Sequence, residues 1–146
     1  MTSVRGKMAI LIAEQDSDWG DWLRSLRCEA DDVIILLQRQ DEGATAFATR
    51  VRGRIHDLRD GEIVAAALVG GEHFDDSVLG ARSAVARAIV AQMAAQGRGQ
   101  LFLDGGVRSG RGRHAMQALA NVVFDQVAQT GVQVFSSGVE AFRRAA

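Results

Sequence analysis

The sequence contains no proline and no tyrosine, a single cysteine (Cys28), and one lysine against sixteen arginines. One cysteine excludes an intrachain disulfide, so nothing in the cysteine content indicates secretion. Because proline is absent, the ends of helices and strands must be marked by glycine and by short polar residues. Because arginine is the standard surface cation of this chain, a single arginine carries little weight as a functional signal.

Long apolar runs are also missing. The longest, at 63–69, is far shorter than the roughly 20 residues that a transmembrane helix needs. The apolar stretch at 8–13 is too short for the core of a signal peptide, and no small-residue cleavage site follows it. The net charge of −1 provides no overall basic field for nucleic acid. We therefore predict a cytoplasmic protein without a membrane segment and without a nucleic-acid partner.

The size and composition of the chain fit one ordinary domain. Its 146 residues are 47% hydrophobic and 24% charged, which is enough to build a core without disulfides or metals. We expect this domain at 8–138. A tail at 1–7 precedes it, and a second tail or short helix follows at 139–146.

Short apolar runs alternate with longer amphipathic segments. The short runs predict strands at 8–13, 33–37, 63–69, 101–103 and 132–135. The first helix is expected after an N-cap at Asp16 or Ser17, and the second after an N-cap at Asp41. The second helix carries one apolar stripe: Phe47, Val51, Ile55 and Leu58. A third, alanine-rich helix is predicted at about 76–96, ending at Gly97, and a fourth ends at Gly131.

Five strands separated by four helical segments predict a three-layer α/β sandwich. Its sheet would be mainly parallel and Rossmann-like, with helices on both faces. Right-handed crossovers leave few arrangements of the strands. We favour the order 3-2-1-4-5, with the flavodoxin-like order 2-1-3-4-5 as the alternative.

Ligands of such sheets bind beyond the carboxyl ends of the strands, near the point where the strand order reverses. The loop after the fourth strand, at 104–113, is rich in glycine and arginine and leads into a helix. The segment 98–114 has a net charge of +3, against −4 for the rest of the chain. Backbone N–H groups and a helix N-terminus favour an anion. The predicted ligand contacts are Asp16, Gln40, Gly106, Arg108, Ser109, Gly110, Arg111, Gly112 and Arg113.

Established nucleotide-binding motifs do not match this sequence. The glycine frame at 105–110 is followed by Arg111 and Gly112, where a Walker loop has lysine and a hydroxyl residue. The segment 14–20 has one glycine where a dinucleotide fingerprint needs three. A polar cluster follows the third strand: Glu72, His73, Asp75 and Asp76. Its residue types are compatible with acid-base or metal chemistry, but their spacing is not diagnostic, and we favour a helix cap at Asp75 or Asp76 with His73 in an exposed loop. We assign no catalytic and no metal-binding residue.

The order of elements and the segment 10–17, Ile-Leu-Ile-Ala-Glu-Gln-Asp-Ser, resemble the universal stress protein family. Ser17 matches a serine of that family, and Gln15 stands where the family has an aspartate. The family's phosphate-binding glycines end in Gly-Ser or Gly-Thr. The corresponding glycines here have a different spacing and lack the final hydroxyl: Gly106, Gly110 and Gly112. The resemblance implies a five-stranded α/β domain, a homodimer formed through the last strand and, in many members, bound ATP.

Two functions of different class follow from the sequence. The first is a non-catalytic domain that binds a phosphate-bearing small ligand, with ATP or another nucleotide as the candidate, at the 104–113 loop. The alternative is a protein-interaction or homo-oligomerisation module without a small ligand. Self-association would then use the fifth strand or the alanine-rich helix. A homodimer fits both functions, and we expect no enzymatic activity.

Overall fold

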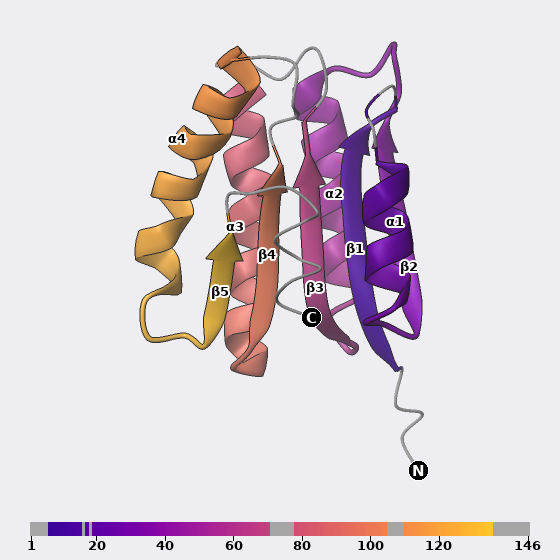
Figure 1. Ribbon diagram of the computed structural model, residues 1–146, viewed down its shortest axis with the longest axis vertical. Coiled ribbons are helices and arrows are strands. Elements are labelled where there is room, and N and C mark those ends of the chain that lie inside the picture. The colour runs from indigo at the N-terminus through magenta and orange to yellow at the C-terminus, as the bar shows by residue number, and fades with distance from the viewer. Residues whose placement is uncertain (1–5, 16, 18, 71–77, 105–109, 136–146) are drawn as a thin grey trace.

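The computed structural model contains a five-stranded sheet with helices on both faces (Figure 1). It describes residues 6–15, 17, 19–70, 78–104 and 110–135, and of 110–113 the backbone alone. The strands are β1 (Lys7–Glu14), β2 (Asp32–Gln38), β3 (Glu62–Val69), β4 (Gly99–Asp104) and β5 (Val132–Phe135). The helices are α1 (Gly20–Arg27), α2 (Ala44–Asp57), α3 (Leu79–Gln96) and α4 (Gly110–Val127). The predicted fold class is therefore confirmed.

All neighbouring strands of the sheet are parallel, and their order is β2-β1-β3-β4-β5. The favoured order 3-2-1-4-5 is wrong, and the flavodoxin-like alternative is correct. The physical reason is burial. β3 is buried along nearly its whole length and belongs inside the sheet, whereas Asp32 and Ile35 of β2 are exposed, as an edge strand permits.

This order changes the point at which the chain reverses its direction across the sheet. After β1 the chain moves outward to β2, then crosses back over β1 to β3 and continues to β5. The reversal therefore lies between β1 and β3, and not between β1 and β4 as the favoured order required. The loops beyond Glu14 and Val69 flank it.

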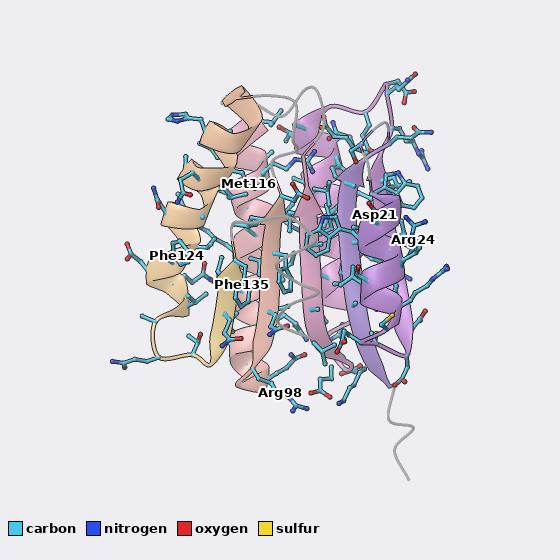
Figure 2. The ribbon with its side chains drawn as sticks, in the orientation of Figure 1. Asp21, Arg24, Arg98, Met116, Phe124 and Phe135 are labelled. Carbon is cyan, nitrogen blue, oxygen red and sulfur yellow. The ribbon has the colours of Figure 1, made fainter. Side chains whose placement is uncertain are left out.

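Two apolar layers hold the helices to the sheet. α2, α3 and α4 cover one face, and their core includes the predicted α2 stripe of Phe47, Val51, Ile55 and Leu58, which is confirmed. α1 packs on the other face through Trp22 and Leu26. Met116 of α4 is buried against the sheet, whereas Phe124 of the same helix is 42% exposed (Figure 2).

The helix starts differ from the predicted ones. α1 has Trp19 as its N-cap, so the cap predicted at Asp16 or Ser17 is wrong. The Ser17 hydroxyl donates to the Glu14 carbonyl oxygen at 2.7 Å. The N-cap of α2 is Gly43, so the cap predicted at Asp41 is wrong. The glycine predicted to end α3 is confirmed, since Gly97 is its left-handed C-cap. Among the described residues, no helix has the length and apolar character to cross a bilayer.

Candidate functional site

Three polar side chains stand at the carboxyl ends of the strands: Glu14 of β1, Gln38 of β2 and Asp104 of β4. Because side chains alternate between the two faces of a sheet along each strand, these three do not all lie on the same face. Glu14 and Gln38 share the face of Ile12 and Leu36, which pack under α2 and α3. Asp104 lies on the opposite face and bonds to Trp22 of α1. The described edge is therefore divided into two polar groups, one on each side of the sheet.

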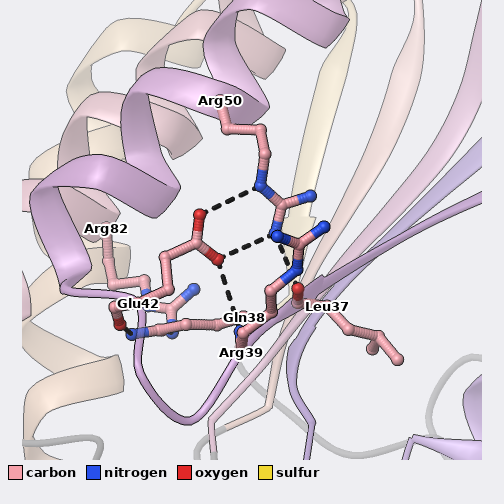
Figure 3. A network of polar contacts seen from close by, with 6 residues as sticks. All are labelled: Leu37, Gln38, Arg39, Glu42, Arg50 and Arg82. Atoms are coloured by element: carbon pink, nitrogen blue, oxygen red, sulfur yellow. Dashed lines mark hydrogen bonds and ion pairs between the residues drawn. The ribbon is translucent and has the colours of Figure 1, made fainter.

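A buried arginine dominates the α2–α3 side. Arg82 of α3 is 4% exposed, and its Nη2 donates to Oε1 of Gln38 at 2.7 Å (Figure 3). Its guanidinium carbon lies 5.1 Å from the centroid of the Phe47 ring. Burial lowers the pKa of the Arg82 guanidinium, and the negative charge of Glu14 opposes that shift. A guanidinium stays protonated under these conditions, so this side of the edge contains a fixed positive charge.

An ion pair of Glu42 and Arg50 lies beside this arginine. Nε and Nη2 of Arg50 donate to the two Glu42 carboxylate oxygens at 3.0 and 2.8 Å, and Phe47 lies under the Arg50 guanidinium as well. The same Nη2 donates to the Leu37 carbonyl oxygen at 2.7 Å. The hydrogen bond from Arg50 lowers the pKa of Glu42, and the same bond raises the pKa of Arg50. The loop between β2 and α2 is thereby tied to the end of β2.

The Glu42 pair predicts a pH-dependent stability. The pKa of Glu42 in the folded protein is below its ordinary value of 4.5, so the ion pair contributes its full stabilisation at pH values above 4.5. The contribution is lost as the pH falls through the lowered pKa. We expect Glu42→Gln to cost about 1 kcal/mol or less at neutral pH, since water screens both partly exposed side chains. Urea unfolding followed by tryptophan fluorescence should show the two proteins converging between about pH 5 and pH 3. A pH-independent difference between them would contradict this assignment.

On the α1 side, aromatic rings fix the position of Asp104. The indole N–H of Trp22 donates to Oδ2 of Asp104 at 2.9 Å, and the backbone N–H of Gly70 donates to the Asp104 carbonyl oxygen at 2.7 Å. Trp22 also contacts Phe102, with ring centroids 5.4 Å apart, and Phe102 stacks on Phe135 at 4.9 Å. The residue from which the glycine-arginine loop departs is thus held by both a side-chain and a backbone contact.

The predicted ligand contacts fall into three groups. Asp16, Gly106, Arg108 and Ser109 lie outside the described residues, as does the cluster of Glu72, His73, Asp75 and Asp76. Four of the predicted contacts form the first turn of α4: Gly110, Arg111, Gly112 and Arg113. The helix therefore begins before the end of the loop predicted at 104–113. Gln40 is exposed in the turn after β2. β2 and β4 are three strand spacings apart, roughly 14 Å, so a ligand that contacts Gln40 and α4 together must be about as long as a nucleotide.

Sequence reasoning missed Arg82. A signal was available, because Arg82 precedes Val85 and Ala86 by three and four residues and therefore shares the buried face of α3. A charged residue on an apolar helical face must be paired or functional. Among the described residues, no three histidine, cysteine or acidic side chains gather closely enough to hold a metal ion.

Comparison with models of known protein families gives no match for this chain, and comparison with curated protein sequences gives none either.

Proposed function

We propose that this domain binds a phosphate-bearing small ligand of about nucleotide size at the carboxyl edge of its sheet and catalyses no reaction on it. The observation that supports this proposal most is the strand order, which reverses between β1 and β3. Doubly wound sheets bind their ligands at such a reversal, because the loops on its two sides diverge and leave a crevice. The start of α4 follows β4, the next strand along.

The phosphate group of the ligand would be bound by the start of α4. The first turn of this helix, at 110–113, contains two glycines and two arginines and no acidic residue. Its backbone N–H groups have no partner within the helix, and the helix dipole favours negative charge there. In the proposal, Gly106, Arg108 and Ser109 contribute from the preceding loop.

The remainder of the ligand would extend toward β1 and β2. Asp16 follows the end of β1, and Gln40 follows the end of β2. Carboxylate and amide oxygens accept hydrogen bonds from the hydroxyl and amino groups of a sugar or base. The resemblance to universal stress proteins, of which many members bind ATP, makes ATP the first ligand to test. A cytoplasmic homodimer remains part of this proposal.

Titration calorimetry with ATP, ADP, AMP, cyclic AMP and inorganic pyrophosphate tests the proposal. We expect saturable binding of at least one of these compounds. Arg111→Ala should weaken that binding by about tenfold or more, as expected for loss of a charge-assisted contact to phosphate. Arg52→Ala serves as the matched control, because Arg52 is an exposed arginine of α2. If no compound binds, or if both variants bind as the wild type does, the proposal fails and the interaction module becomes the better explanation.

A further inference from the structure

β2 is an edge strand, and alternate residues along it direct their backbone groups away from the sheet. The Gln38 carbonyl oxygen accepts from the Gln15 N–H at 3.1 Å, so the backbone of Gln38 faces β1. By alternation, the backbone groups of Val33, Ile35 and Leu37 face outward. Such a row of outward N–H and C=O groups can pair with another strand.

Side chains occupy the outward groups at the carboxyl end of this edge. Arg50 Nη2 donates to the Leu37 carbonyl oxygen at 2.7 Å, and Oε1 of Glu42 accepts from the Arg39 N–H at 3.3 Å (Figure 3). The two side chains are joined to each other by two hydrogen bonds. The Nε2 group of Gln38 donates to the Glu42 carbonyl oxygen at 2.9 Å and fixes the loop. The ion pair therefore takes the place that a sixth strand would need.

The rest of the edge lacks the usual protection. The segment 33–37 contains no charged residue, no proline and no glycine, and its register with β1 is regular. Ile35 is 37% exposed, one of two large hydrophobic side chains exposed among the described residues. Natural edge strands avoid pairing through charge, proline or bulges, and β2 has none of these between Val33 and Leu37.

The sequence of β2 is complementary to a second copy of itself. In an antiparallel pair centred on Ile35, the outward backbone of Val33 meets that of Leu37 of the second copy. Asp32 then lies opposite Gln38 of the second copy. Asp31 precedes β2, and its N–H and Oδ2 bond to the backbone of Lys7, so it lies beyond the end of the pair, near Arg39 of the second copy. No like charges face each other in this register, and the acidic end of one copy meets the basic end of the other. This pairing requires the Leu37 carbonyl group that Arg50 occupies.

We propose that the Glu42–Arg50 pair is an edge guard, which keeps β2 from pairing with a second copy of the chain. While Arg50 remains on the Leu37 carbonyl oxygen and Glu42 on the Arg39 N–H, the pair centred on Ile35 cannot form the two hydrogen bonds that its Leu37 carbonyl groups would accept. Loss of the guard exposes the whole edge, and the chain then associates through β2. The inference is independent of ligand binding at the carboxyl edge.

Arg50→Met tests the guard, because methionine keeps much of the apolar stem and removes the guanidinium. Sedimentation velocity over about a hundredfold range of concentration should show self-association at least about tenfold tighter than that of the wild type. Arg52→Met, which removes an exposed guanidinium of the same helix, should behave as the wild type. Adding Ile35→Lys to Arg50→Met should restore the wild-type particle mass, since lysine on an edge strand blocks pairing.

Two results would overturn the inference. One is a folded Arg50→Met protein, shown by circular dichroism, with the wild-type mass at every concentration. The other is association that persists with Ile35→Lys, because it must then use a different surface. If Arg50→Met does not fold, Arg50→Gln replaces it, since this change also removes the guanidinium that donates to the Leu37 carbonyl oxygen. A folded Arg50→Gln protein that does not associate also overturns the guard.

Discussion

Phe47→Ala should lower the free energy of unfolding by about 3–5 kcal/mol, the usual cost of removing a buried phenyl ring. The Phe47 side chain is 1% exposed and belongs to the core between α2 and the sheet. The guanidinium carbons of Arg50 and Arg82 each lie 5.1 Å from its ring centroid. Alanine would leave a cavity and also remove the aromatic face from both cations. Urea unfolding followed by tryptophan fluorescence measures the loss.

Two variants separate the contributions of volume and aromatic character. Phe47→Leu keeps most of the apolar volume but not the ring, and should cost about 1–2 kcal/mol. Phe124→Ala makes the same truncation at a side chain that is 42% exposed, and should cost less than about 1 kcal/mol. If Phe47→Ala is no more damaging than Phe124→Ala, the ring does not support the two arginines in the way described.

Phe47 links the two charged features of this part of the molecule. Arg50 acts at the outer edge of β2, and Arg82 lies buried at the carboxyl end of the sheet; both guanidinium groups approach the same ring. A guanidinium on an aromatic face is attracted to the ring quadrupole while its N–H groups remain available for hydrogen bonds. Arg50 thus reaches Leu37 and Arg82 reaches Gln38 from one common support.

Periodicity made the elements predictable. The stripe of α2 repeats at helical spacing, and all four of its members are buried. The apolar runs at 8–13 and 63–69 predicted strands, and the corresponding strands β1 and β3 are buried along most of their length. These features depend on neighbours within one element, which a sequence displays directly.

Strand order depends on contacts between elements, which periodicity does not encode. The useful signal was the difference between β3, covered on both faces, and β2, with Ile35 and Asp32 exposed. The residues of the candidate site are likewise not predictable from periodicity alone, because they come from different elements. The spacing of Arg82 from Val85 and Ala86 marks it among sixteen arginines as a residue of the buried face of α3, but its contacts with Phe47 and Gln38 come from other elements and are visible only in the structure.

Gly131→Ala is expected to cost about 2–4 kcal/mol, for two independent reasons. Gly131 has φ of 81°, a left-handed conformation that costs an L-residue roughly 1–2 kcal/mol. A Cβ atom at this position would also overlap the backbone carbonyl oxygen of Gly97, which cannot rotate away as a side chain can. The turn before β5 and the turn before β4 therefore touch, and this contact helps to fix the register in which Gly99 lies opposite Val132. Thermal and urea unfolding measure the cost.

Gly97→Ala and Gly53→Ala separate the two reasons. Gly97 has nearly the same φ, 82°, but a Cβ there meets nothing within 4 Å, so its replacement should cost only the conformational share, about 1–2 kcal/mol. Gly53 lies in α2 with open space around it, and alanine there should stabilise the protein by about 0.5–1 kcal/mol. Equal costs at Gly131 and Gly97 would mean that the two turns are not in close contact.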